Sequence, residues 1–200
     1  TIRTLPAHTW AQDREPILSV TGPSFLVSLL EPMLIWLHYP IQLATTASRY
    51  YQGIDPHPPA FGTATCEDHR RWIESTVGPI LGTCPRIEVD PTGYEESVAR
   101  RAAALVAAVG DDPDRIFEVG MRSAVCMEQH RIALRACRQN GILRTSNVLL
   151  AAELEMIPVG TMGHEHVQRW GSDLTAFRAM RDMRSAPPSY LLDTFDTLGS

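Results

Sequence analysis

From residue 115 onward the chain alternates short apolar runs with longer helical stretches, and this alternation limits the possible folds more than any other feature. The apolar runs cover residues 116–119, 142–144, 157–160 and 190–192. The stretches between them, residues 123–139, 146–155 and 165–183, have the length and residue choice of helices. Strands that alternate with helices predict parallel βαβ units, and four such strands are half of an eight-stranded barrel. The sequence therefore predicts an α/β fold with a partial (β/α) barrel.

The first part of the chain has a different pattern. Residues 16–20 predict a short strand, and a long apolar segment of helical length follows over residues 25–51. Pro32 and Pro40 are expected to start, kink or break helices within that segment. Two more helices are expected, over residues 67–77 and 94–109. We therefore expect two domains: part of an N-terminal α+β domain over 1–114, and the barrel half over 115–200.

Charge and cysteine usage exclude several classes of protein. The 200 residues carry 18 Lys and Arg against 23 Asp and Glu, a net charge of −5. Such an acidic chain has no basic surface for nucleic acid phosphates. It has no unbroken run of eighteen apolar residues, so we expect no membrane partner. The four cysteines form no C-x-x-C pair, which indicates reduced thiols in a cytoplasmic protein.

A polar cluster follows each predicted strand of the barrel half. Functional residues of parallel α/β folds gather at the carboxyl ends of strands, so these clusters are expected to converge. They are Gly120-Met121-Arg122, Thr145-Ser146-Asn147, the run Gly160-Thr161-Met162-Gly163-His164-Glu165, and the run Asp193-Thr194-Phe195-Asp196-Thr197. A cation, hydroxyls, a histidine in a glycine-rich turn and two acids suit an anionic, phosphate-bearing substrate with a metal ion. Glycines and the amides of the helix beginning near His164 allow close approach to phosphate, and Asp193 and Asp196 offer oxygen ligands for Mg²⁺.

Each of these residues also has a purely structural interpretation. Arg122 could be a surface salt-bridge partner. Ser146 or Asn147 could be the N-cap of a helix. His164 could be structural, and Asp193 could cap a turn. Both interpretations stay open on the pattern alone.

Other candidate sites are weaker. His164 and His166 are two residues apart and point to different sides of a helix, which disfavours a zinc site. Cys66 and His69, with Cys84, give a partial metal spacing without a fourth ligand. Three aromatic side chains are expected in the core rather than in a stacking platform: Trp36, Tyr39 and Trp72.

Taken together, these motifs resemble those of nicotinate phosphoribosyltransferases. The resemblance runs over most of the chain and rests on residues 15–23, 30–32, 44–49, 117–122, 145–148, 158–165 and 193–197. The run Pro158-Val159-Gly160-Thr161-Met162-Gly163-His164-Glu165 is the most specific of them. The resemblance implies the barrel of a type II phosphoribosyltransferase.

The resemblance also implies a reaction. Nicotinate and phosphoribosyl pyrophosphate would give nicotinate mononucleotide and pyrophosphate in NAD salvage, with Mg²⁺ on the pyrophosphate and ATP as co-substrate. The pyridine nitrogen already carries a lone pair, so catalysis would consist of positioning and charge stabilisation. His164 matches the catalytic histidine that ATP phosphorylates in the family. The implied substrate-binding residues are Arg122, Ser146, Asn147, Gly160, Thr161, Asp193 and Thr194, and the implied metal ligands are Asp193 and Asp196.

Ser146 gives a physical argument about the substrate. Related enzymes that take nicotinamide have an aspartate at the matching position, which accepts from an amide and repels a carboxylate. A serine donates to a carboxylate, so Ser146 favours the acid. Two positions depart from the family pattern: Ser123 stands where a second arginine is usual, and Gly163 where alanine is usual.

Some parts of the family pattern have no counterpart in this sequence. They are the tyrosine motif that stacks on the pyridine ring and the later barrel strands with their phosphate-binding glycines. The resemblance therefore implies the middle of a longer enzyme, and a homodimer. Two other functions stay open: a truncated or degenerate homologue that binds a nucleotide or a partner without turnover, and a related enzyme acting on nicotinamide or quinolinate.

Overall fold

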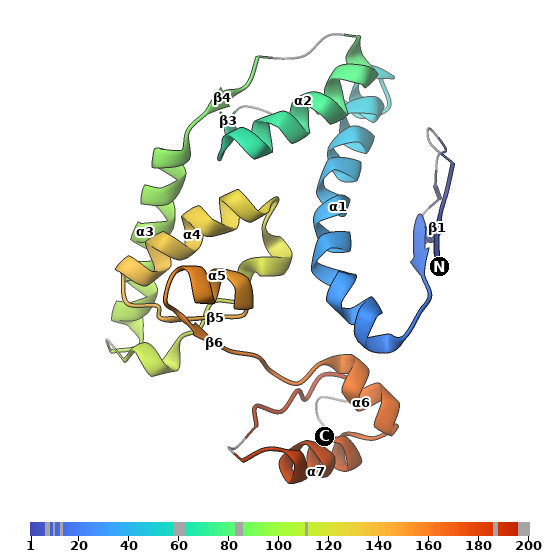
Figure 1. Cartoon of the computed structure of the whole chain (residues 1–200). Coiled ribbons are helices and arrows are strands. Elements are labelled where there is room, and N and C mark those ends of the chain that lie inside the picture. Colours follow the sequence, from blue (N-terminus) through green and yellow to red (C-terminus); the bar gives the residue numbers. More distant parts are fainter. Residues whose placement is uncertain are drawn as a thin grey trace. The chain divides into compact units, whose positions relative to one another are not determined.

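Two compact units make up the chain, Thr1–Leu143 and Arg144–Ser200. The computed structural model describes residues 1–6, 9, 11–12, 14–57, 63–82, 86–110, 112–185 and 188–195 (Figure 1). The division between the units differs from the domain boundary expected after residue 114, which stays a prediction.

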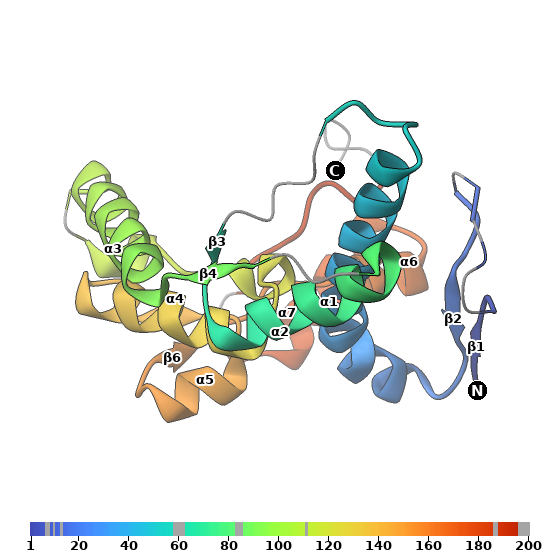
Figure 2. The same cartoon turned by 90° about the horizontal axis from the view of Figure 1, so that it is seen from above.

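The first unit opens with a hairpin. β1 (Ile2–Thr4) pairs antiparallel with β2 (Leu18–Val20), as Figure 2 shows for the two arrows near the N-terminus. β2 confirms part of the strand expected over residues 16–20. Its partner β1 is an element that the sequence pattern does not predict.

A long helix follows the hairpin. α1 (Ser24–Tyr51) is one helix of 28 residues, and neither Pro32 nor Pro40 ends it. A proline inside a helix removes one backbone hydrogen bond and crowds the preceding turn. α1 also packs on α2 (Glu67–Leu81), and most helical stability in proteins comes from such tertiary contacts.

α1 is also long and apolar enough to cross a bilayer, judged by its length and composition. Several of its large apolar side chains are exposed: Phe25, Leu26, Leu29, Met33, Leu37 and Ile41. One such helix does not by itself indicate a membrane, because helices of soluble proteins can have the same length and composition. The absence of a membrane partner and the cytoplasmic location both stay predictions.

Two further helices of the first unit lie side by side: α3 (Pro91–Ala108) and α4 (Met127–Gln139) (Figure 1). α3 begins three residues before its expected start, because the Asp90 side chain accepts a hydrogen bond from the Gly93 amide at 2.8 Å and so caps the first turn. α4 begins four residues after its expected start, because a short 3₁₀ turn, η2 (Gly120–Ser123), precedes it. These helices and α2 confirm the three helices expected in this region.

The first unit also contains a parallel strand pair that the sequence pattern misses. β3 (Thr63–Ala64) and β4 (Glu88–Val89) pair in parallel, and α2 connects them. A buried cluster packs between α1, α2 and these strands: Ala47, Ala64, Ile73, Val77 and Ile87. A second cluster, Ala102, Cys137 and Ile142, joins α3 to α4.

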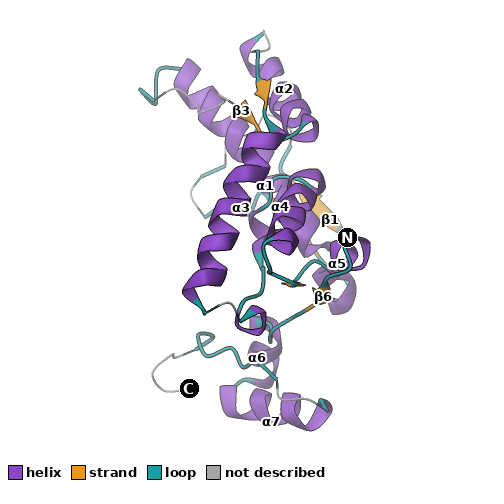
Figure 3. Cartoon of the chain, turned by 90° about the vertical axis from the view of Figure 1, so that its left-hand side faces the viewer, coloured by secondary structure: helices purple, strands orange, loops and turns teal. Residues whose placement is uncertain are grey.

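The second unit contains a parallel βαβ element of the predicted kind. β5 (Arg144–Thr145), α5 (Val148–Glu153) and β6 (Ile157–Pro158) follow one another, and the two strands pair in parallel. This confirms the expected strand–helix–strand order over residues 142–160. Each strand is two residues long, and Figure 3 shows how little of the chain is strand.

The helix expected over residues 165–183 is wrong as a single helix. The structure has two, α6 (His164–Trp170) and α7 (Asp173–Met183). Gly171 takes a left-handed conformation (φ +71°) that ends α6. The Ser172 hydroxyl then accepts from the Thr175 amide at 3.2 Å and starts α7.

Two of the expected strands are also wrong. Residues 116–119 contain a single bridging residue, Glu118, and residues 190–192 form no strand. A strand exists only where a partner offers its backbone groups. The expected barrel half stays a prediction.

Candidate functional site

Two of the four predicted polar clusters lie at the ends of paired strands. In the second unit Thr145 is opposite Pro158, and the Val159 amide donates to the Thr145 carbonyl at 2.9 Å. Ser146 and Gly160 therefore follow the two strands at the same edge of the β5–β6 pair, where both strands end. This is the arrangement that parallel strands predict for a site at their carboxyl ends.

Asn147 is the best-defined side chain of this edge. It is only 2% exposed, and its Oδ1 accepts a hydrogen bond from the Leu150 amide at 3.1 Å. The side chain is therefore the N-cap of α5, which is the structural role that the sequence left open. Ser146 precedes it and is half-buried.

Two clusters of the second unit, residues 160–165 and 193–197, meet through one side-chain contact. His164 begins α6, and its Nε2 lies 3.2 Å from Asp193 Oδ1. The side chains are 52% and 60% exposed, so the pair faces solvent. Two residues that are 29 positions apart, and that follow different predicted strands, thus lie in direct contact.

A small core brings Asp193 to His164. Met162, Val167 and Ala176 are buried between α6 and α7, and Leu191 packs against them. The rings of Phe177 and Tyr190 add a contact with centroids 4.8 Å apart. The segment before Asp193 is therefore held by packing, although it is not a strand.

The remaining predicted residues of the second unit have less defined surroundings. Gly160 and Thr161 are exposed, and the Thr161 hydroxyl makes only a long contact of 3.5 Å with the Met162 carbonyl. The Thr194 hydroxyl is buried without a hydrogen-bond partner among the described residues. Asp196 lies outside the described residues.

The histidine neighbour of His164 has a structural contact. His166 Nε2 lies 3.2 Å from the Ala176 carbonyl oxygen, and its ring packs on Trp170. Within the described residues no group of three or more His, Cys, Asp and Glu side chains could hold a metal ion. Mg²⁺ usually takes one or two carboxylates and completes its shell with water and substrate phosphates. The exposed carboxylate of Asp193 fits that limited requirement.

Arg122 belongs to the first unit, where it sits in the turn η2. Its Nη2 lies 2.9 Å from Glu31 Oε1 of α1. The salt-bridge interpretation of Arg122 thus describes its contact in this structure. A guanidinium that is 68% exposed also remains accessible to an anion.

Sequence reasoning missed the residues that hold this turn. Trp36 Nε1 donates to the Met121 carbonyl at 2.7 Å, although the sequence predicts only a core role for Trp36. Glu118 accepts a hydrogen bond from the Gly120 amide, and its other carboxylate oxygen lies 3.3 Å from His130 Nε2. No local signal pairs α1 with residues 120–122, because the contacts join parts of the chain about 85 residues apart.

The weak metal candidate around Cys66 is a buried packing cluster. Cys66 Sγ lies 3.6 Å from Cys126 Sγ, and burial raises the pKa of the Cys126 thiol to about 12. His69 Nδ1 accepts from the Thr65 amide at 3.1 Å, Nε2 lies 2.8 Å from the Tyr39 hydroxyl, and burial lowers the His69 pKa. Tyr39 and Trp72 pack against this cluster, which confirms their core role. Cys84 lies outside the described residues.

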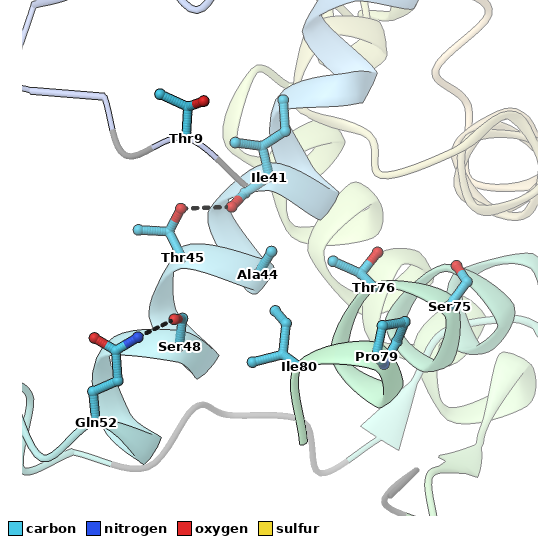
Figure 4. A pocket seen from close by; sticks show the side chains of 10 residues that line it. All are labelled: Thr9, Ile41, Ala44, Thr45, Ser48, Gln52, Ser75, Thr76, Pro79 and Ile80. Carbon is cyan, nitrogen blue, oxygen red and sulfur yellow. Dashed lines mark hydrogen bonds between the residues drawn. The ribbon is translucent and has the colours of Figure 1, made fainter. Parts of the chain in front are cut away.

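A hollow of about 690 Å³ lies between α1 and α2 (Figure 4). Mainly hydroxyl and aliphatic side chains line it. The Thr45 hydroxyl donates to a backbone carbonyl of α1, and the Ser48 hydroxyl accepts from the Gln52 side chain. The described residues that line it include no charged side chain. These described residues therefore bring no positive charge to the hollow.

Comparison with known proteins gives one kind of relative. The chain is 34% identical over 101 residues to the nicotinate phosphoribosyltransferase pncB2 from two strains of Mycobacterium tuberculosis. The match covers 50% of this chain and 21% of the relative, so the chain spans about a fifth of the length of the curated relatives it matches. No protein-family model matches the chain, and no solved structure matches it. This local match supports a relationship of the chain to the phosphoribosyltransferase family.

Proposed function

We propose that the chain carries out the chemistry of a nicotinate phosphoribosyltransferase. Nicotinate would attack C1 of phosphoribosyl pyrophosphate through its ring nitrogen, and the bond from C1 to the pyrophosphate oxygen would break. The products are nicotinate mononucleotide and pyrophosphate. The local match to pncB2 is the observation that carries the proposal, and the contact between His164 and Asp193 supports the site.

His164 is proposed as the residue that couples ATP to this transfer. Its Nε2 faces the Asp193 carboxylate at 3.2 Å, so a proton on Nε2 would be held there and Nδ1 would carry the free lone pair. That nitrogen would accept a phosphoryl group from ATP, and ADP would leave. Asp193 therefore orients the imidazole and stabilises the phosphorylated ring.

Ser146 is proposed to select the acid form of the pyridine. It is half-buried at the end of β5, next to the capping residue Asn147. A hydroxyl at this point donates to a carboxylate, whereas a carboxylate side chain would repel one. Asn147 is proposed to act through α5, as the residue that orders the backbone after Ser146.

Anionic groups of the substrates would be bound by cations and by exposed backbone. Arg122 is proposed as a partner for a carboxylate or a phosphate, and Gly160, Thr161 and Thr194 as polar contacts of phosphoribosyl pyrophosphate. Asp193, with Asp196, is proposed to hold Mg²⁺. When bound, the ion would neutralise charge on the leaving pyrophosphate. A homodimer in the cytoplasm is proposed as the working form.

Matched variants test the proposal. Nicotinate, nicotinamide and quinolinate are each supplied with phosphoribosyl pyrophosphate and Mg²⁺, with and without ATP, and the mononucleotides are separated by mass. We expect nicotinate to be the preferred substrate. We expect ATP to stimulate wild type and the control His57→Ala, whose side chain is 88% exposed in the first unit, but not His164→Ala. Ser146→Asp should shift preference toward nicotinamide. Unchanged ATP stimulation in His164→Ala would refute its assigned role, and substrate binding without any product would support the degenerate binder instead.

A further inference from the structure

The turn that carries Arg122 is held at three consecutive residues. The Gly120 amide donates to the Glu118 carboxylate. The Met121 carbonyl accepts from Trp36 Nε1 at 2.7 Å. The Arg122 guanidinium pairs with Glu31 at 2.9 Å. The turn η2 is therefore fixed by side chains, and α1 supplies two of them.

The two contacts made by α1 differ in character. The bond from Trp36 to Met121 is partly buried and fixes the backbone of the turn. The pair of Glu31 and Arg122 is exposed, with 53% and 68% of the two side chains accessible. Ion pairs this exposed contribute little to stability, so another anion can replace the Glu31 carboxylate at little cost.

We propose that Glu31 is an intramolecular competitor for the anion that binds Arg122. In the unliganded chain its carboxylate occupies the guanidinium, and a carboxylate or phosphate of the substrate displaces it. Both kinds of anion offer oxygens to the same guanidinium N–H groups. Trp36 keeps the backbone of the turn in place, so displacement changes only two side chains. This inference rests on the proposed function, because it assigns Arg122 to an anionic substrate.

The test measures anion binding at Arg122 directly. The side-chain Nε–H resonance of Arg122 is identified by its loss in Arg122→Gln, and it is followed while inorganic phosphate or nicotinate is added separately. Glu31→Gln should bind the anion about two- to five-fold more tightly than wild type, the range that an exposed ion pair allows. Glu96→Gln is the matched control, because it removes one carboxylate from another exposed glutamate–arginine pair, with Arg100.

The outcomes separate the inference from the proposed function. If Glu31→Gln and Glu96→Gln tighten binding equally, the effect is one of net charge and the inference is wrong. If neither anion shifts the Arg122 resonance, the inference is also wrong, whether or not the chain forms a mononucleotide product. Tighter binding in Glu31→Gln without any mononucleotide product would support the inference and refute the proposed function. Product formation with unchanged anion binding in Glu31→Gln would support the proposed function and refute the inference.

A second variant tests the part assigned to Trp36. Trp36→Phe keeps an aromatic ring but loses the donor to the Met121 carbonyl. We expect it to weaken phosphate binding several-fold, both in the wild-type background and together with Glu31→Gln, because the turn is no longer fixed. Unchanged binding in Trp36→Phe would overturn the role given to Trp36.

Discussion

Replacing Asn147 with alanine should destabilise the start of α5. Its Oδ1 accepts the hydrogen bond of the Leu150 amide at 3.1 Å, and Leu150 is fully buried. Loss of an N-cap costs about 0.5–2 kcal/mol. Water cannot replace the cap at a buried position, so we expect the upper end of that range, about 2 kcal/mol. This corresponds to an equilibrium constant for local opening that is about thirty-fold larger.

Hydrogen exchange with mass spectrometry measures this opening. A peptide over residues 148–156 reports α5, and a peptide over residues 127–139 reports α4 as an internal reference. Asn147→Ser should lose much less protection than Asn147→Ala, because a serine hydroxyl also caps helices. Equal protection in wild type and Asn147→Ala would refute the reasoning, as would equal losses in the two variants.

Three further predictions concern the first unit. Burial lowers the His69 pKa, so the unfolded chain binds a proton that the folded chain excludes, and the free energy of unfolding should fall as pH drops below about 6.5. Urea midpoints at pH 7.5 and 5.5 should therefore differ more in wild type than in His69→Gln, and equal differences would contradict this. Burial raises the pKa of the Cys126 thiol to about 12 and that of the Cys137 thiol to about 11. Iodoacetamide at pH 8 should therefore modify both thiols rapidly only in urea, and fast labelling of the folded chain would contradict their burial. Leu134 is fully buried. In urea denaturation, Leu134→Ala should lower the free energy of unfolding by about 2–5 kcal/mol and Leu134→Met by less than about 1.5 kcal/mol. A small decrease for Leu134→Ala would show that the site is not tightly packed.

The helices of this chain were the predictable part of its fold. Apolar spacing and local stop signals predict α2, α3 and α4 because those signals lie within each helix. Asn140-Gly141 is an example, since Gly141 takes φ +92° directly after α4. The split between α6 and α7 was missed, although Gly171 and Ser172 together form a stop and a start signal.

The strands were less predictable because a strand needs a partner as well as an apolar run. β5 and β6 form where two runs lie on either side of one short helix. β3 and β4 are two residues long and have no periodicity to detect. Residues 190–192 are apolar, but their role in the structure is packing: Leu191 contacts the core between α6 and α7.

In the candidate site, too, some features could be predicted from the sequence and others depend on contacts that only the folded chain makes. Motif order predicted that four polar clusters would converge, and among their residues His164 and Asp193 are in contact. Sequence alone did not choose between the two interpretations of Asn147, because capping depends on the amide of Leu150 being within reach. Trp36 and Glu31 could not be assigned to Arg122, because only the folded chain brings α1 to that turn.

Detection of nicotinate mononucleotide tests the central claim most directly. The purified chain is incubated with nicotinate, phosphoribosyl pyrophosphate and Mg²⁺, with and without ATP, and the product is quantified by mass spectrometry against a boiled-protein blank. The account predicts a product that requires phosphoribosyl pyrophosphate and increases with ATP. Product at the level of the blank under both conditions would contradict the proposed reaction.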